Sequence, residues 1–278
     1  MPLILVGTPI GNLGDLSPRA VEALAAADAI CCEDTRRTGR LLQHAGVPRT
    51  PLVVVNDHTE DGAIDGVLAR LAAGERVAVV SDAGMPGISD PGERLVHAAV
   101  AAGYVVEVVP GPSAAITALV ASGLPAGRFV FEGFLPRKGS GRSQRLAEIA
   151  DERRTVVLYE APHRLARTLA DLGSVCGAAR AVALGRELTK LHEEIWRGTL
   201  AGAVDWATSH EPRGELVIVL EGAPAPPAAS DDDVESAVQA RLDAGDTARD
   251  AATAVAARLG VPKRTAYEVA VRLRAQKR

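Results

Sequence analysis

The chain has 278 residues, of which 47% are hydrophobic and 24% charged, and its net charge at pH 7 is −4. This length allows roughly two domains and a smaller third part, and the composition is typical of a globular protein. The acidic balance excludes a protein that coats nucleic acid with its whole surface, so such contact requires a local basic patch. No stretch is apolar enough to span a bilayer, and the first residues lack the features of a signal peptide. We therefore expect a cytoplasmic protein without membrane contact.

Three cysteines, Cys31, Cys32 and Cys176, show a spacing that fits neither a metal site nor a disulfide framework. Cys31 and Cys32 lie within an apolar run and are expected to be small buried hydrophobic residues. The sequence therefore predicts a reduced protein with no metal site.

Short apolar runs alternate with amphipathic segments over the first 112 residues. Such continuous runs are typical of parallel strands covered by helices on both faces. We therefore predict an N-terminal α/β domain over 1–112 with a mostly parallel sheet. Its strands are expected at 3–6, 29–32, 52–55, 77–80 and 105–109, and its helices at 17–27, 37–45, 63–73 and 93–102.

Residues 81–92 connect the fourth predicted strand to the next helix and contain three glycines and two prolines. Such a loop brings fixed backbone amides close to a ligand, and in α/β sheets ligands bind at the carboxyl ends of strands. Asp90 and Pro91 are expected to be the N-cap and first residue of the following helix. The loop predicts a small-molecule site.

The next part of the chain predicts a second α/β domain over 113–222, with a mixed sheet whose strand order stays open. A helix at 114–122 joins it to the first domain. Its strands are expected at 129–134, 155–159, 181–184, 194–197 and 216–220, and its other helices at 142–152, 163–172 and 200–208.

A proline-rich linker at 223–230 precedes a helical tail at 231–278. Helices are expected at 231–244, 247–259 and 262–276, and the turn between the last two makes the tail similar to a helix-turn-helix. Residues 262–278 contain six lysines and arginines and one glutamate, which favours contact with nucleic acid. The alternative is a small bundle that docks on the main body or on a second subunit.

Several common motifs are absent from the sequence, among them the phosphate-binding P-loop, the H-E-x-x-H zinc motif and C-x-x-C. The turn at 7–12 also differs from the dinucleotide fingerprint. Instead, polar and Gly/Pro-rich strings follow predicted strands in both halves of the chain. The parsimonious interpretation is a cleft between two domains that binds a polar molecule.

Six of these strings carry a resemblance to a known family. Together they resemble the tetrapyrrole-methylase superfamily, and within it the branch that methylates the ribose 2′-oxygen of a cytidine in the decoding region of small-subunit (16S) rRNA. The strings are G-T-P-I-G-N-L-x-D at 7–15, E-D-T-R at 33–36, S-D-A-G-x-P-x-I-S-D-P-G at 81–92, P-G-P-S-A at 110–114, G-F-L-P at 133–136 and Y-E-x-P-H-R at 159–164.

The resemblance covers essentially the whole chain, including the tail. It implies a two-domain tetrapyrrole-methylase-like fold that works as a homodimer on the small ribosomal subunit, with S-adenosylmethionine (AdoMet) as methyl donor. Met85 stands where the family often has threonine. The resemblance assigns AdoMet contacts to Thr8, Pro9, Asp82, Ala83, Gly84, Ile88, Ser113, Ala114, Leu158, Tyr159, Gly185, Arg186, Gly214 and Glu215.

Methylation of a ribose hydroxyl gains from positioning of the two partners and from a base or a group that stabilises the developing alkoxide. Asp34 as base and Arg36 as stabilising cation form the preferred arrangement; Glu33, His163, Arg186 and Glu187 are alternatives, and any of these residues equally fits RNA binding or dimer contacts. No metal is required. The candidate RNA contacts are Arg37, Arg40, Arg137, Lys138, Arg142, His163, Arg164, Lys263 and Arg264.

Two other functions compete with this interpretation. One is a corrin-pathway methyltransferase of the same superfamily, which would need neither the E-D-T-R and Y-E-x-P-H-R strings nor a basic tail. The other is a non-catalytic RNA- or ribosome-binding protein that retains a ligand pocket. The intact set of cleft strings favours the enzyme.

Overall fold

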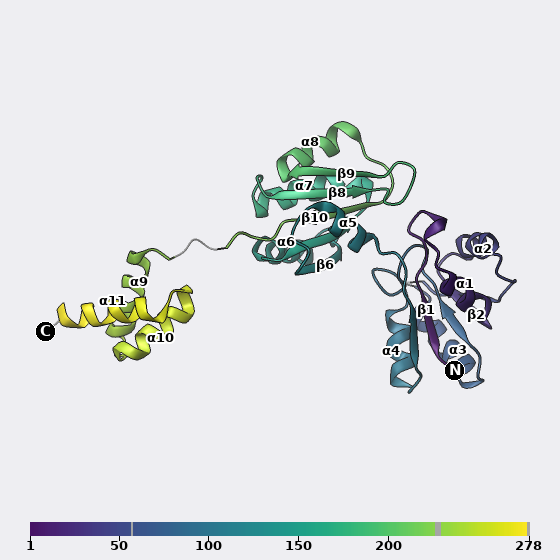
Figure 1. Ribbon diagram of the computed structural model, residues 1–278, viewed down its shortest axis with the longest axis horizontal. Helices are drawn as coiled ribbons and strands as arrows, with labels where there is room; N and C mark the ends of the chain where they lie inside the picture. The colour runs from purple at the N-terminus through teal and green to yellow at the C-terminus, as the bar shows by residue number, and fades with distance from the viewer. Residues whose placement is uncertain (57, 226–228, 277–278) are drawn as a thin grey trace. The chain divides into compact units, whose positions relative to one another are not determined.

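The computed structural model describes residues 1–56, 58–225 and 229–276. The chain forms two compact units, residues 1–223 and residues 224–278 (Figure 1). Residues 226–228 of the predicted linker lie outside the described residues. Within the described part, no helix has the length and apolar character needed to cross a bilayer.

The first sheet of unit 1 has five strands in the order β3-β2-β4-β1-β5, and every pair in it is parallel. This confirms the predicted parallel sheet. Successive residues of β1 point to opposite faces, so Ile4 joins one hydrophobic core and Leu3 the other. The strands are β1 (Leu3–Val6), β2 (Ala29–Cys32), β3 (Leu52–Val54), β4 (Val77–Val79) and β5 (Val106–Val109).

Helices cover both faces of this sheet. The helices α1 (Pro18–Ala25) and α2 (Thr35–His44) contribute Leu24 and Leu42 to one core. On the other face, α3 (Glu60–Ala72) and α4 (Glu93–Ala101) contribute Leu71 and Leu95. A short 3₁₀ helix, η1 (Leu13–Asp15), lies in the loop after β1.

The second sheet of unit 1 is mixed, as predicted, with the order β6-β7-β10-β8-β9. Only β6 and β7 pair in parallel; the other three pairs are antiparallel. The strands are β6 (Phe129–Phe134), β7 (Thr155–Glu160), β8 (Ala181–Arg186), β9 (Glu194–Thr199) and β10 (Leu216–Leu220).

The two faces of the second sheet are covered unequally. Leu146, Leu169 and Trp206 pack on one face from α6 (Ser140–Asp151), α7 (Pro162–Cys176) and α8 (Leu200–His210). The other face is covered by α5 (Ala114–Ser122), whose Ala118 joins a smaller core. The smaller cover leaves room at the strand ends for a pocket.

One predicted helix start is wrong. Asp90 and Pro91 do not begin α4, which starts at Glu93 with Gly92 as N-cap at φ 126°. Gly92 has no side chain to cap the helix, and Glu60 from α3 supplies the acceptor instead. The local sequence therefore predicted a cap at Asp90, but the acceptor for the first amides of α4 comes from another helix.

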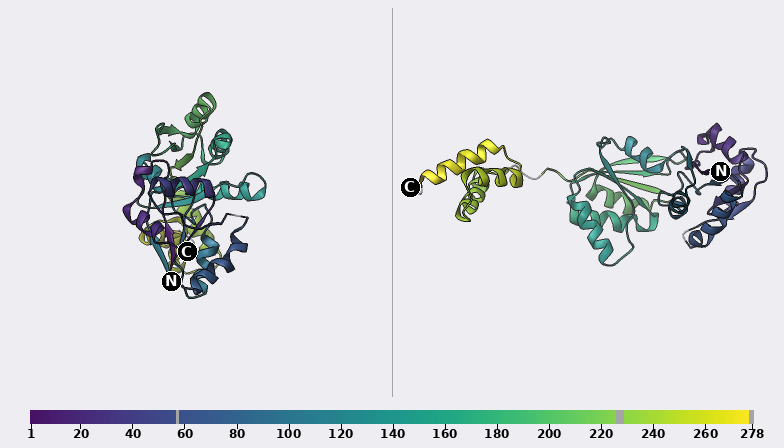
Figure 2. Two further views of the ribbon diagram at one scale, coloured as in Figure 1. Left: turned by 90° about the vertical axis from the view of Figure 1, so that its right-hand side faces the viewer. Right: turned by 90° about the horizontal axis from the view of Figure 1, so that it is seen from below.

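Unit 2 consists of α9 (Asp231–Asp243), α10 (Ala248–Leu259) and α11 (Lys263–Gln276), which pack together around one core (Figure 2). Ser230 and Asp233 form a capping box at the start of α9. Ala252, Ala266 and Ala270 are fully buried, and their small side chains let the helices approach closely. Gly260, at φ 67°, ends α10 in the left-handed conformation before the turn into α11.

Candidate active site

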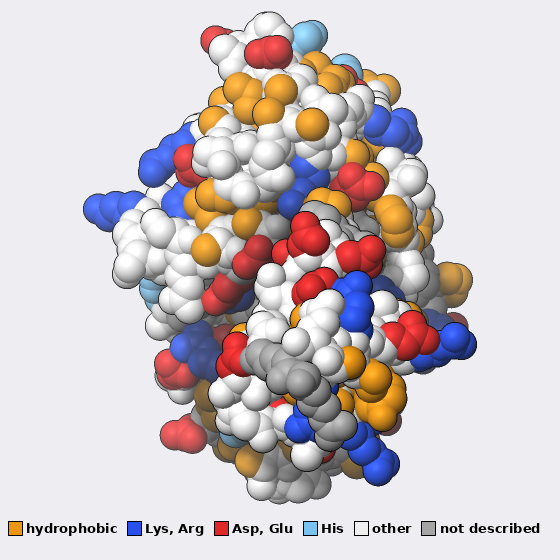
Figure 3. All heavy atoms as spheres, turned by 90° about the vertical axis from the view of Figure 1, so that its left-hand side faces the viewer, with side chains coloured by type: hydrophobic (Ala, Val, Ile, Leu, Met, Phe, Trp, Pro, Cys, Tyr) orange, Lys and Arg blue, Asp and Glu red, His pale blue; other side chains and the backbone are white. Residues whose placement is uncertain are grey.

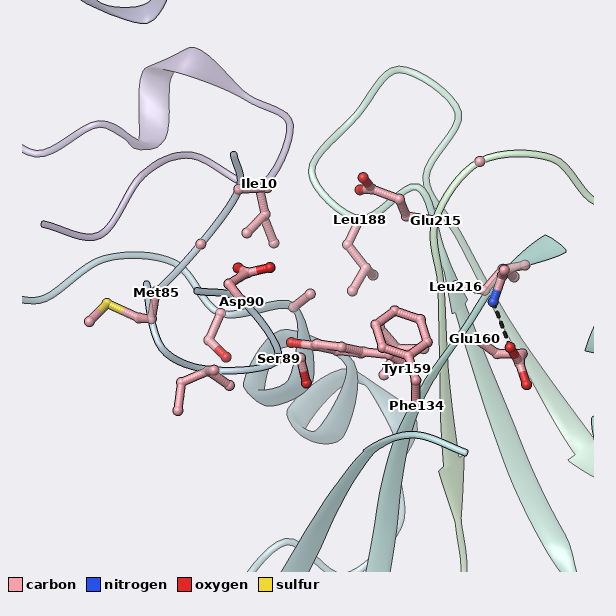
Figure 4. Close-up of a pocket in the computed structure, with 18 of the residues that line it drawn as sticks. Ile10, Met85, Ser89, Asp90, Phe134, Tyr159, Glu160, Leu188, Glu215 and Leu216 are labelled. Carbon is pink, nitrogen blue, oxygen red and sulfur yellow. Dashed lines mark hydrogen bonds between the residues drawn. The ribbon is translucent and has the colours of Figure 1, made fainter. Parts of the chain in front are cut away.

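A pocket of about 320 Å³ lies where loops of the two sheets of unit 1 meet (Figure 4). Ile10 and the 81–92 loop form one wall, and the ends of β6, β7 and β10 form the other. This volume is within the range of small-molecule sites. The lining residues are Ile10, Ala83, Gly84, Met85, Ile88, Ser89, Asp90, Ser113, Ala114, Phe134, Tyr159, Glu160, Ala161, Pro162, Leu188, Gly214, Glu215, Leu216 and Val217.

The 81–92 loop is fastened at its first half to the loop after β1. The Thr8 amide donates to the Gly84 carbonyl at 2.8 Å, and the Gly84 amide donates back to the Thr8 carbonyl at 3.1 Å. The buried Thr8 hydroxyl also donates to the Ser81 carbonyl at 3.2 Å. Gly84 has φ +85°, and a Cβ there would lie 3.3 Å from Ile10. Glycine thus allows both the turn and the close approach.

The second half of the loop is fastened to α3. One carboxylate oxygen of Glu60 accepts the amides of Gly92 and Leu95, each at 3.0 Å. The other accepts Nε of Arg94 at 3.2 Å. Glu60 is only 3% exposed, so its charge is stabilised by these donors and by the N-terminus of α4.

Tyr159, from β7, lines the wall of the pocket opposite the 81–92 loop. Its ring meets Phe131 edge-on, with centroids 5.0 Å apart, and Phe134 at 5.6 Å. The Ala115 amide donates to its hydroxyl oxygen at 3.3 Å. Burial raises the pKa of Tyr159, so the phenol stays neutral at physiological pH and does not act as an anionic base there.

The lining contains three carboxylates and, among the described residues, no lysine, arginine or histidine. Glu160 accepts from the Thr168 hydroxyl at 2.5 Å and the Ala161 amide at 2.8 Å, and it pairs with Arg164 at 3.1 Å. Asp90 and Glu215 lie on opposite walls in Figure 4. Arg164 and Lys190, which pair with Glu160 and Glu215, lie outside the lining. The charged residues of the lining itself are all acidic, which favours a ligand that is partly apolar and positively charged.

The outer edge of this wall is an ion-pair cluster around Lys190. Its Nζ donates to Glu187 at 2.8 Å and to Glu215 at 2.9 Å, and the hydrogen bond lowers the pKa of Glu187. The Lys190 side chain also lies against Gly11, where a Cβ would be 2.4 Å from its Cγ. Lys190 therefore joins the loop after β1 to the second sheet.

Acidic and basic side chains gather where β2 and β4 end. The Asp82 amide donates to Glu33 at 3.0 Å, the Asp34 amide donates to Asp82 at 3.2 Å, and Arg37 pairs with Asp82 at 3.4 Å. Asp34 is the N-cap of α2 and accepts the Arg36 amide at 2.8 Å. None of these residues lines the pocket.

The bond between Asp34 and Arg36 disfavours the predicted role of Asp34 as base. The Arg36 guanidinium donates to Asp34 at 3.1 and 3.3 Å and lowers the carboxyl pKa to about 2. A carboxylate with so low a pKa is a weak proton acceptor. Asp34 therefore serves as the N-cap of α2 and as the ion-pair partner of Arg36.

The predicted AdoMet residues fall into two groups. Ala83, Gly84, Ile88, Ser113, Ala114, Tyr159, Gly214 and Glu215 line the pocket. Thr8, Pro9, Asp82, Leu158, Gly185 and Arg186 do not. Leu158 faces the core on the other side of the sheet because neighbouring strand residues alternate, and Arg186 pairs with Glu194 at 3.2 Å. Thr8 and Asp82 hold loops in place instead.

The predicted RNA contacts also separate. Arg37, Arg40, Arg137, Lys138, His163, Lys263 and Arg264 are exposed. Arg142 is only 5% exposed; it pairs with Asp171 at 2.7 Å and donates to the Pro136 carbonyl at 3.0 Å. Arg164 is bound to Glu160 and to the Leu135 carbonyl. The prediction is wrong for Arg142, whose charge is used inside the protein.

Several lining residues were missed by sequence reasoning. Most of them lie inside strings that the sequence already indicated: Asp90 and Ser89 in the 81–92 loop, and Phe134 in G-F-L-P. Their residue types gave no separate signal. The described residues contain no group of three or more His, Cys, Asp or Glu side chains placed for a metal ion.

The two sheets with a pocket at their loop ends define the class of protein. The chain belongs to the family of tetrapyrrole (corrin/porphyrin) methylases, whose sequence pattern matches residues 2–204, and within it to ribosomal RNA small subunit methyltransferase I (RsmI). It is 46% identical over 275 residues to the protein of that name from Synechocystis sp., covering 98% of both chains.

Solved structures share this fold. The methyltransferase CobJ superposes with a TM-score of 0.62 at 24% identity, over 80% of this chain and 94% of its own. Uroporphyrin-III C-methyl transferase from Thermus thermophilus, complexed with S-adenyl homocysteine, gives a TM-score of 0.57 at 19% identity, over 80% of this chain and 97% of its own.

Proposed function

We propose that this methyltransferase transfers a methyl group from AdoMet to the RNA of the small ribosomal subunit. The observation that carries the proposal is the pocket with carboxylates and no cation in its described lining, in a chain of the RsmI family. Bound AdoMet would supply a methyl group activated by a sulfonium cation. A pocket lined by lysine or arginine would repel that cation.

The residues of the pocket fit AdoMet in three respects. Ile10, Leu188 and Val217 provide apolar surface for a flat ring, and the glycine at 84 exposes backbone close to the cavity. Asp90 and Glu215 provide negative charge for the sulfonium and the ammonium group. We infer that these two carboxylates hold the donor, because both line the pocket and lie on its opposite walls.

The finer proposal is methylation of the ribose 2′-oxygen of one cytidine in the decoding region of 16S rRNA, by a cytoplasmic homodimer. The six sequence strings support it, since they resemble that branch. Its chemistry needs a hydroxyl held in line with the methyl group.

RNA would reach the pocket along exposed basic residues. Arg36 and Arg37 lie at the start of α2, and Arg137 and Lys138 follow β6. Acidic, basic and hydrophobic side chains are interspersed over the face drawn in Figure 3. Lys263 and Arg264 of α11 add a second contact in unit 2.

The test is methyl transfer from labelled AdoMet to small subunits that lack the modification, followed by mapping of the labelled nucleotide. We expect one ribose-methylated cytidine, and no incorporation into large subunits as the matched control. Label on a base would contradict the 2′-O proposal. Bound AdoMet without transfer to any rRNA would favour a tetrapyrrole acceptor or a non-catalytic RNA-binding role.

A further inference from the structure

We propose that Phe134 is the stacking surface for the base of the target nucleotide, with Arg137 and Lys138 binding the adjoining phosphates. The inference rests on the proposed function, because it assumes an RNA acceptor at this pocket. It concerns the residues that bind the acceptor RNA rather than those that bind the methyl donor.

Phe134 is unusual among the eight Phe, Tyr and Trp side chains of this protein. It is 52% exposed, and only Tyr267 in unit 2, at 46%, is comparably open. Phe134 also lines the pocket, and Figure 4 shows it beside Tyr159. An exposed ring in the pocket lining leaves apolar surface in water, so a partner that covers this ring would stabilise the complex.

A β-bulge turns Phe134 toward the pocket. In β6, Phe131 pairs with Val157, but after a register shift Gly133 pairs with Leu158 and Phe134 with Tyr159. Without the extra residue, strand alternation would place residue 134 on the face of Val130, which packs into the helix-covered core. The bulge therefore re-aims one aromatic ring onto the pocket side.

The bulge packs against the 81–92 loop of the pocket. Gly133 has φ +59°, and a Cβ there would lie 3.0 Å from the Ser89 hydroxyl. Ser89 itself has φ 60°, a conformation that non-glycine residues adopt rarely and that is found at functional sites. The bulge thus fits against the 81–92 loop.

Two arginines hold the chain that follows Phe134. Arg164 donates to the Leu135 carbonyl at 2.6 Å, and Arg142 donates to the Pro136 carbonyl at 3.0 Å. Leu135 is itself buried. These hydrogen bonds fix the backbone on which the exposed ring is mounted, so stacking of a base on it costs little conformational freedom.

Two cationic residues follow Phe134 in the chain. Arg137 and Lys138 are exposed. Bases of RNA stack on aromatic side chains when they are unpaired, and basic side chains near the platform bind the backbone. An exposed aromatic ring that is followed three and four residues later by two exposed cations fits an unpaired nucleotide.

The experiment compares Phe134→Ala, Phe134→Leu and Phe134→Trp in the full-length protein. For Ala and Leu we expect kcat/KM for small subunits to fall roughly 5- to 150-fold, since stacking on an aromatic ring is worth about 1–3 kcal/mol. Trp should retain most of the activity. Because Phe134 also lines the AdoMet pocket, AdoMet affinity, measured by calorimetry, should fall much less than kcat/KM for small subunits. Val100→Ala, an exposed apolar residue of α4, is the matched control.

A second measurement needs no catalysis. A short unpaired RNA with 2-aminopurine should lose fluorescence when its base stacks on the wild-type protein, and Phe134→Leu should abolish the quenching. Methylation by the wild-type protein tests the proposed function separately. The stacking proposal is overturned if Leu behaves as wild type, if AdoMet binding falls in parallel with activity, or if no quenching occurs.

Discussion

Asp34 is both the cap of α2 and the ion-pair partner of Arg36. It accepts the Arg36 amide at the start of the helix and binds the Arg36 guanidinium. We expect Asp34→Asn to keep the cap, because asparagine caps helices as well as aspartate does, and to retain most methyl transfer. Loss of activity comparable with removal of a general base, in assays with rRNA, would restore Asp34 as the proton acceptor.

The pH dependence of Asp34 follows from the same ion pair. Arg36 lowers the folded-state pKa of Asp34 from the ordinary 3.8 to about 2. The stabilisation is therefore present above about pH 4 and disappears as the pH falls toward 2. We expect Asp34→Asn to abolish this part of the acid dependence of unfolding, while activity profiles above pH 5 show no ionisation from residue 34. An Asp34-dependent step near neutral pH would contradict this.

The loop that forms one pocket wall depends on a buried carboxylate in a helix far along the chain. Glu60 accepts the amides of Gly92 and Leu95. We expect Glu60→Ala to destabilise the protein by about 2–4 kcal/mol, because two buried amides and a guanidinium lose a charged acceptor. AdoMet affinity should also fall, since the loop is released.

Asp61→Asn is the matched control for Glu60. Asp61 is the next residue, also pairs with Arg94 (2.8 Å), and is mostly exposed. Exposed ion pairs contribute roughly 0–1 kcal/mol, so Asp61→Asn should leave stability and AdoMet binding nearly unchanged in thermal unfolding and calorimetry. Equal effects of the two substitutions would show that the Arg94 pair, rather than the amides, matters.

The division of the chain into two compact units predicts that AdoMet binding depends on unit 1 alone, whereas subunit binding depends on both units. All described lining residues of the pocket lie in unit 1, and α9, α10 and α11 have their own core. A protein ending at Ala223 should therefore bind AdoMet as the full chain does and bind small subunits more weakly. Weaker AdoMet binding by the shortened protein would contradict this division.

Point variants on α11 sharpen that prediction. Lys263, Tyr267 and Arg274 are exposed and spaced to share one helix face. The double variant Lys263→Ala/Arg274→Ala should weaken subunit binding and reduce the salt dependence of log K by about 0.7–0.9 for each phosphate that is no longer neutralised. Arg249→Ala on α10, measured by filter binding at several salt concentrations, is the control and should change neither.

Local sequence signals were sufficient to predict the α/β class and the kind of each sheet, because apolar runs and glycine-rich turns depend on residues close together in the chain. The parallel and mixed sheets and the 81–92 loop were predictable in this way. The domain bounds at 112 and 222 and the helix-turn-helix resemblance stay predictions. Side chains were harder: Leu158 and Tyr159 are neighbours, yet alternation sends only Tyr159 to the pocket.

Contacts between distant parts of the chain fix which charges face outward and which ring lines the pocket. Nothing in the local sequence separates Arg142 from Arg137. In the structure Arg142 is buried and binds Asp171 and the Pro136 carbonyl, whereas Arg137 is exposed. The bulge that turns Phe134 is set by pairing with β7 and by the fit of Gly133 against Ser89. Such partners lie far apart in the chain, so no local pattern contains them.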